Sequence, residues 1–160
     1  QVFALSIGVL SGDLARRVVA ACYRHLAVPG ALRSLAPLPV TVPLDLRSAD
    51  GKPLNDPLNP YWGIYSGDED TRRKPAYHNG TAWTWPFPSL CEAMALAWER
   101  SPAALAAARA LLGSTDLLLH GGCVGQVPEV LDGDAPHAQK GCDAQAWGVT
   151  EALRVWKILG

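Results

Sequence analysis

The 160-residue sequence has few charged residues and no block of like charges. Lysine, arginine, aspartate and glutamate together make up 18% of it, and the formal net charge is −1. Nucleic-acid-binding proteins usually carry a basic patch, so this balance argues against a nucleic-acid partner. The low charge instead predicts either much buried surface or a surface that meets another molecule.

Long hydrophobic runs are also missing. No uninterrupted apolar run reaches the roughly 18 residues that cross a bilayer, so the sequence predicts no membrane partner. The apolar start QVFALSIGVL has no basic segment before it, unlike a secretory signal peptide. These absent signals predict a cytoplasmic location.

The sequence lacks several motifs of well-known catalytic sites. It has no glycine-rich phosphate loop and no G-x-S-x-G nucleophile elbow. The four cysteines form no C-x-x-C pair, and reduced thiols are expected in the absence of a secretory signal. Cys22 and Cys91 lie in apolar, helical contexts, which predicts that both are buried.

Hydrophobic periodicity indicates several helices. The expected ranges are a helix after Ser11 that ends before Pro29, and helices over 83–100, 101–113 and 142–159. The segment 116–120 extends the third helix or forms a short one of its own. Trp98 and Trp156 fall within the helical patterns and are expected in the core.

The segment 31–74 differs from the rest because prolines and glycines are dense and no helical pattern occurs. Extended segments or short strands are expected there, and a connection of this length is usually functional. The predicted fold class is therefore mainly α, with long loops that carry short β segments. We expect one domain over 1–160.

Two polar loops contain the residue types of a sugar-binding enzyme. One is YHNGTAWTWPFPS (77–89), and the other is PEVLDGDAPHAQKG (128–141), which carries Glu129, Asp132, Asp134 and His137. Glycoside hydrolysis needs one protonated and one ionised carboxyl group. Flat aromatic faces and neutral polar groups suit a sugar ring, and these are offered by Tyr77, His78, Asn79, Trp83, Trp85, Gln145 and Trp147. The plainer interpretation, a solvated acidic loop with tryptophans in the core, remains open.

A zinc site is an alternative. Imidazole and thiolate ligands suit zinc, and the candidates are His120, Cys123, His137 and Cys142. The glycines between the first two equally predict a tight turn. A zinc-stabilised α domain is therefore kept as another possible function.

Four segments resemble the C-terminal part of the catalytic domain of glycogen debranching enzymes of the amylo-α-1,6-glucosidase type. They are QVFAL (1–5), GALRSLAP (30–37), YHNGTAWTWPFPS (77–89) and PEVLDGDAPHAQKGCDAQAWGVTEALR (128–154). The resemblance covers nearly the whole chain, and its last two segments are long and specific. One departure is WTWPF, where the family has a tryptophan-proline-tryptophan type of segment.

The resemblance implies a portion of an (α/α)6 toroid, the six-hairpin barrel of glucoamylases. The implied reaction is inverting hydrolysis of α-1,6 branch-point glucose in glycogen or limit dextrin, with Glu129 as general base and with no cofactor or metal. The glucose would be lined by Tyr77, His78, Asn79, Trp83, Trp85, Gln145 and Trp147. Asp132 would orient Glu129 or a sugar hydroxyl, and His137 would bond the acidic loop or the substrate. The presence of glycogen in the cytoplasm agrees with the expected location.

No residue matches the family's general acid, which the resemblance places upstream of Gln1. We therefore expect a fragment of a longer enzyme that is inactive on its own. Exposed helix faces would favour self-association or pairing with the missing barrel helices. The alternative is a non-catalytic fragment that binds α-glucan or serves in assembly.

Overall fold

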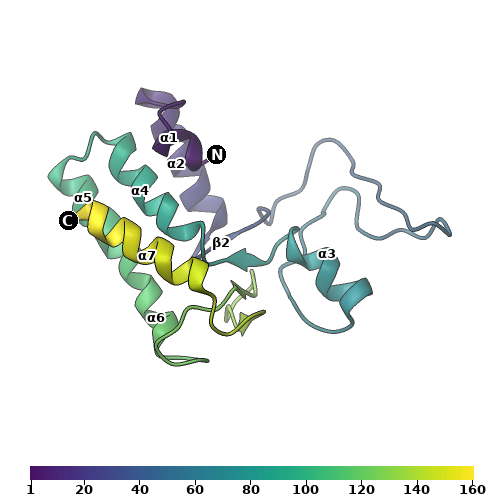
Figure 1. Ribbon diagram of the computed structural model, residues 1–160. Helices are drawn as coiled ribbons and strands as arrows, with labels where there is room; N and C mark the ends of the chain where they lie inside the picture. Colours follow the sequence, from purple (N-terminus) through teal and green to yellow (C-terminus); the bar gives the residue numbers. More distant parts are fainter.

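The computed structural model describes residues 1–160, and 44% of them are helical. A helical bundle makes up one side of the molecule (Figure 1). Its members are α1 (Phe3–Ser6), α2 (Gly12–Leu26), α4 (Phe87–Ala97), α5 (Pro102–Leu112) and α7 (Ala146–Leu159). A 3-10 turn, η2 (Gly113–Thr115), joins α5 to α6 (Asp116–Leu119). The mainly α prediction is confirmed.

Helix α4 is the centre of the bundle and contacts α1, α2, α5 and α7. Its sequence FPSLCEAMALA is apolar apart from Ser89 and Glu92, which is typical of a helix surrounded by others. Phe87, Leu90 and Cys91 are fully buried in the main core cluster, which Cys22 joins from α2. Both predictions of a buried cysteine are therefore confirmed.

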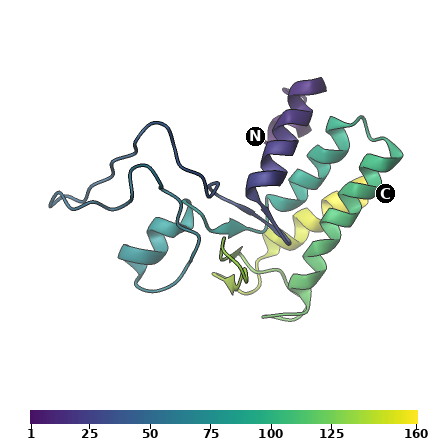
Figure 2. The same ribbon diagram turned by 180° about the vertical axis from the view of Figure 1, so that it is seen from behind.

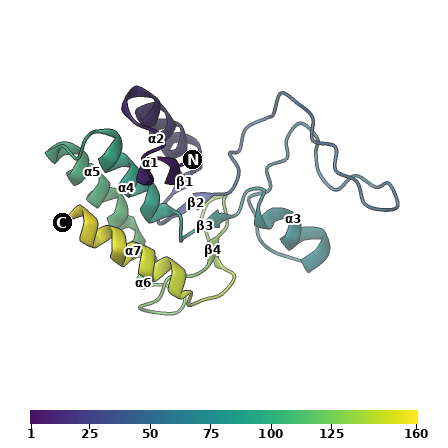
Figure 3. The same cartoon turned by 45° about the horizontal axis from the view of Figure 1, so that its top comes forward.

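A small antiparallel sheet lies beside the bundle (Figure 3). Its five strands pair in chain order and are β1 (Ala27–Val28), β2 (Ala31–Arg33), β3 (Ala82–Trp83), β4 (Val130–Leu131) and β5 (Gln139–Lys140). Leu32 pairs with Trp83, and Trp83 pairs with Val130. The sheet thus brings together the two polar loops, which lie about fifty residues apart in the sequence.

A long arm, residues 34–68, leaves β2 and projects away from the bundle (Figure 2). The chain then returns through the short π-helix η1 (Glu69–Arg73) and the helix α3 (Lys74–Tyr77). Its two sides run antiparallel: the Val40 amide donates to the Leu58 carbonyl at 2.9 Å, and the Leu54 amide to the Leu46 carbonyl at 2.8 Å. An isolated bridge pairs Arg47 with Pro53. The expected extended segments therefore occur here without forming regular strands.

Two helix predictions began too early. The expected 83–100 helix begins only at Phe87, because the backbone of Ala82 and Trp83 pairs with the strands on either side. Pro86 and Pro88 lie at its first positions, where proline is tolerated. The expected 142–159 helix begins at Ala146, because the preceding residues are used in loop hydrogen bonds.

The core assignment of two tryptophans was wrong. Trp98 is 40% exposed at the end of α4, and Trp156 is 57% exposed on α7. Trp98 directly follows the last residue of α4, and Trp156 lies on a part of α7 that the other elements leave mostly exposed. Helical spacing identifies a face but does not say whether another element packs on it.

The run Pro102–Leu119, which joins α5 to α6, spans 18 residues with a mean hydropathy of 1.2, and 28% of it is buried. By length and composition this run could cross a membrane. It contains Arg109 and Asp116, and core helices of soluble proteins satisfy the same measure. The absence of a membrane partner stays a prediction.

Candidate functional site

Glu129 lies directly before β4, between the two polar loops. Its backbone amide donates to the Cys142 carbonyl at 2.8 Å, and its carbonyl accepts from the Thr84 amide at 3.3 Å. The Thr84 hydroxyl adds a bond to the Pro128 carbonyl at 2.6 Å. The main chain at Glu129 is therefore fixed on both sides.

The carboxylate of Glu129 accepts one hydrogen bond on each oxygen. The Tyr77 hydroxyl donates to Oε1, and the Cys142 amide donates to Oε2 at 3.0 Å. Gly141 approaches closely: its φ is +72°, and a Cβ there would lie 2.5 Å from Oε2. The half-buried carboxylate is thus held in one orientation.

Tyr77 connects this carboxylate to an aromatic cluster. Its ring lies 4.5 Å from Trp83, 4.8 Å from His78 and 5.5 Å from Tyr65, measured between centroids. The Trp83 indole N–H donates to the Tyr77 carbonyl at 2.9 Å. Burial, and then the hydrogen bond to Glu129, raises the pKa of Tyr77, so the phenol is a neutral donor at neutral pH.

The predicted sugar-facing rings stack mainly on one another. His78 and Trp83 are parallel, 5.3 Å apart and 6° from coplanar, so His78 occupies one face of Trp83. Trp85 stacks on Trp147 at 4.0 Å and on Phe3 at 5.5 Å. His78 and Trp147 are the more exposed members, and Trp147 is 50% exposed. These two offer the more accessible faces to a sugar ring.

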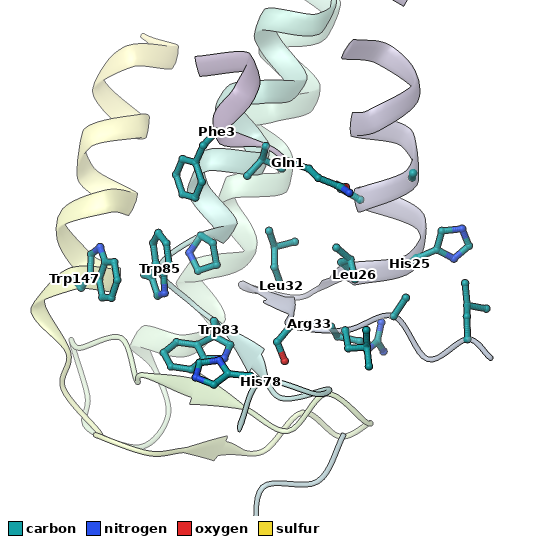
Figure 4. Close-up of a pocket in the computed structure, with 18 residues that line it drawn as sticks. Gln1, Phe3, His25, Leu26, Leu32, Arg33, His78, Trp83, Trp85 and Trp147 are labelled. Atoms are coloured by element: carbon teal, nitrogen blue, oxygen red, sulfur yellow. The ribbon is translucent and has the colours of Figure 1, made fainter. Parts of the chain in front are cut away.

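An open cavity of about 760 Å³ lies against these rings (Figure 4). Its size is within the range of small-molecule sites, about 300–1,000 Å³. The lining is mostly apolar and includes Phe3, His78, Trp83, Trp85 and Trp147, with Arg33 and His25 further along. Glu129 and Tyr77 do not line it. Tyr77 is the direct link, because it contacts Glu129 and the cavity-lining Trp83.

Asp132 makes no hydrogen bond to Glu129. It is buried, and its Oδ1 accepts from the Tyr65 amide at 2.7 Å. The neighbouring Asp134 accepts from the Tyr61 hydroxyl at 2.8 Å. Burial, and then the bond to Asp134, raises the pKa of Tyr61 to about 12. These aspartates hold the segment 61–65 against the acidic loop.

The other predicted polar residues also make internal bonds. The Asn79 side-chain Nδ2 donates to the Pro75 carbonyl at 2.7 Å. His137 bonds the acidic loop as expected: its amide donates to the Asp134 carbonyl at 2.9 Å, and its Nδ1 lies 3.1 Å from the Asp132 carbonyl oxygen.

Gln145 precedes α7, and its amide donates to the Val127 carbonyl at 2.9 Å. Its side-chain Oε1 is buried without a hydrogen-bond partner in the chain. It is therefore the predicted polar residue that keeps an unused acceptor.

The four zinc candidates do not come together. No group of three or more histidine, cysteine, aspartate or glutamate side chains is placed to hold a metal ion. His120 is exposed and pairs with Asp116, with 3.4 Å between Nε2 and Oδ2. Cys123 and Cys142 are exposed free cysteines. The geometry therefore gives no support to a zinc-stabilised domain.

A family model described as amylo-alpha-1,6-glucosidase matches residues 39–154. The chain belongs to the amylo-α-1,6-glucosidase family. The match is consistent with the C-terminal part of a glycogen debranching enzyme. It covers most of the arm and both polar loops of the chain. A comparison with curated proteins finds no matching relative.

Sequence reasoning missed several contributors to this candidate site. Phe3 stacks on Trp85, the Cys142 amide bonds Glu129, and Tyr61 and Tyr65 tie the acidic loop. One signal was available, since the aromatic group at 61–65 lies in a long proline-rich loop and argues against disorder. The Cys142 contact left no signal because it uses the backbone.

Proposed function

We propose that this chain provides the general base of a glycoside hydrolase that releases the α-1,6-linked glucose at branch points of glycogen or limit dextrin. The observation that carries the proposal is Glu129, whose carboxylate is held on both oxygens beside an aromatic cluster. Family membership supplies the substrate class, an α-glucan.

The proposed reaction inverts the anomeric centre. Glu129 removes a proton from water as the water oxygen bonds to the anomeric carbon, on the face opposite the leaving oxygen. The bond from that carbon to the branch oxygen breaks, and a second carboxyl group donates a proton to that oxygen. The two carboxyls of an inverting enzyme stand about 6.5–9.5 Å apart to admit the water.

The general acid is proposed to come from outside these 160 residues. The carboxylates nearest in sequence to Glu129 already hold structural bonds, Asp132 with Tyr65 and Asp134 with Tyr61. Glu92 is paired with Arg154 at 2.8 Å in the helical bundle. We therefore propose that the chain is the C-terminal part of an (α/α)6 barrel. We also propose that it acts in the cytoplasm, where glycogen is present.

The terminal glucose is proposed to contact the accessible faces of His78 and Trp147. Trp83 and Trp85 would then support these rings from behind. Gln145 is proposed to support the site from the start of α7 without touching the sugar, because its Oε1 is buried and the residue does not line the cavity. Asn79 has a structural part in this proposal, because its side-chain Nδ2 donates to the Pro75 carbonyl.

A second candidate is a non-catalytic unit that binds α-glucan or serves in assembly. The observation in its favour is that Glu129 does not line the 760 Å³ cavity. Such a unit would bind glucan on the aromatic cluster without cleaving it.

The deciding experiment measures glucose release from a branched limit dextrin by the full natural protein and by the 160-residue chain. Replacing Glu129→Gln should lower kcat by about a hundredfold to ten-thousandfold, the range of general base catalysis. Asp143→Asn, at an exposed carboxylate in the same region, should leave kcat unchanged.

The first product observed by NMR should be β-glucose, because inversion converts the α linkage. Unchanged kcat in Glu129→Gln would remove Glu129 as the base. Glucan binding without any hydrolysis by the full protein would favour the non-catalytic unit.

A further inference from the structure

We propose that Tyr77 is a positioning residue for Glu129 and not a sugar contact. Its hydroxyl and the Cys142 amide together hold the carboxylate in the orientation that a general base needs. This inference rests on the proposed function for its catalytic consequence. The pairing itself can be tested without any activity.

The first support is the distribution of hydrogen bonds on Glu129. A carboxylate has about four acceptor positions on its two oxygens. The Tyr77 hydroxyl fills one on Oε1, and the Cys142 amide fills one on Oε2. Each oxygen keeps a position for a water molecule, while rotation of the carboxylate would break both bonds.

The second support is that Tyr77 itself is fixed. It ends α3, and the rings of Trp83, His78 and Tyr65 surround its own ring. Tyr77 does not line the cavity, so its ring is not presented to a ligand there. The same rings that withdraw it from the cavity hold its hydroxyl on Glu129.

The third support is the close approach of the loop on the other side. Gly141 has a φ of +72° and leaves no room for a side chain beside Oε2. This approach brings the Cys142 amide to 3.0 Å from that oxygen. A carboxylate oriented before the substrate binds removes part of the entropic barrier to reaction.

The kinetic test is a double-mutant cycle in the full natural protein, with Tyr77→Phe, Glu129→Gln and both together. Tyr77→Phe should lower kcat by about tenfold to a hundredfold, the equivalent of one hydrogen bond to a charged group. KM should stay within about twofold of wild type, because uniform substrate binding is unchanged. In the Glu129→Gln background, Tyr77→Phe should cause no further loss.

Tyr23→Phe is the matched control. It removes the same hydroxyl from an exposed residue of α2 that does not line the cavity, so kcat should stay near wild type. A raised KM with unchanged kcat in Tyr77→Phe would make Tyr77 a sugar contact and overturn the proposal. An equal loss of kcat in both backgrounds would also overturn it.

A tyrosine titration separates failure of the pairing from failure of the proposed function. Tyrosinate absorbance is followed with rising pH in wild type, Tyr77→Phe and Glu129→Gln. The transition that is absent from Tyr77→Phe belongs to Tyr77. In Glu129→Gln this transition should move to lower pH. A transition that does not move would show that the pair is absent, even if Tyr77→Phe lowered kcat through misfolding. If this transition moves but Glu129→Gln keeps a normal kcat, Tyr77 and Glu129 are paired and Glu129 is not the general base.

Discussion

Two tyrosines, Tyr61 and Tyr77, each donate a hydroxyl to a carboxylate of the 129–134 loop. Tyr61 bonds Asp134 and Tyr77 bonds Glu129. Each tyrosine is partly buried, and each pKa is raised above the ordinary value near 10. Ionisation of either phenol would place a second negative charge against its carboxylate. These bonds therefore depend on both phenols keeping their protons.

This linkage predicts lower stability in alkaline solution. The folded pKa of Tyr61 is about 12, against 10.0 for an unperturbed tyrosine. Between these values the native state keeps a proton that the unfolded state has lost. The stabilisation is therefore complete below about pH 10 and disappears as pH rises through the folded pKa. Urea unfolding midpoints should fall through this window.

Tyr61→Phe supplies the control for this prediction. Phenylalanine does not titrate, so the fall in unfolding free energy above about pH 10 should be shallower in this variant. An identical fall in wild type and Tyr61→Phe would mean that Tyr61 has an ordinary pKa.

At the scale of the elements, one cluster joins three helices of the bundle. Glu92 is the charged residue of α4, and its side chain is only 11% exposed. Its Oε2 accepts from Arg154 of α7 at 2.8 Å and from the Ser6 hydroxyl of α1 at 3.4 Å. Arg154 also bonds Glu151 on its own helix at 3.0 Å. The cluster compensates the charge that α4 carries into the bundle.

Arg154→Met should destabilise the fold by about 1–3 kcal/mol, because Glu92 would lose its charged partner while remaining nearly buried. This loss of unfolding free energy is smaller than for a fully buried ion pair, because the Arg154 side chain is 40% exposed and solvent screens its charge. Chemical denaturation followed by circular dichroism measures the change. Arg47→Met removes an exposed ion pair with Asp45 on the arm and should have little effect. Equal losses in the two variants would contradict a special part for the cluster.

The elements themselves were predictable where local signals decide them. Ser101 begins α5 by accepting the Ala104 amide at 3.4 Å, and the helix ends before Gly113, as the sequence indicated. The start of α4 was not predictable from periodicity. Trp83 lies in β3 because strands that are distant in the sequence pair with it. A nonlocal pairing leaves no periodic signal in a strand of two residues.

The whole molecule leaves large apolar side chains exposed on α7. Leu153 is 53% exposed and Trp156 57%. Next to them, a groove of about 270 Å³ between α6 and α7 is lined by Leu119 and Trp156 among others. Exposed apolar surface of this kind is typical of a face that meets another molecule.

We predict that the isolated chain self-associates through this face. Sedimentation velocity over a wide concentration range should show a growing fraction of oligomer. Leu153→Glu should reduce that fraction, because it places a charge in the apolar face. Ala103→Glu adds the same charge at an exposed position of α5 outside this groove and should have less effect. A chain that stays monomeric at every concentration would reject the prediction.

The sequence by itself determined the helical class, the family resemblance and the residue types of the candidate site. These are local properties, since periodicity, capping residues and motifs lie in contiguous segments. It also indicated that Glu129 and the 77–89 loop belong to one site. In the fold the two are in contact, because Tyr77 bonds the Glu129 carboxylate and the Thr84 amide bonds the Glu129 carbonyl.

Only the tertiary structure decided what each of these residues contacts. Asp132 bonds the Tyr65 backbone, Tyr77 faces Glu129, and Trp156 lies on an uncovered helix face. These outcomes depend on how strands and loops far apart in the sequence meet, and on backbone groups such as the Cys142 amide that every residue type shares. A motif identifies the chemical groups that its side chains carry. The tertiary packing determines which of those groups stay free to contact a ligand.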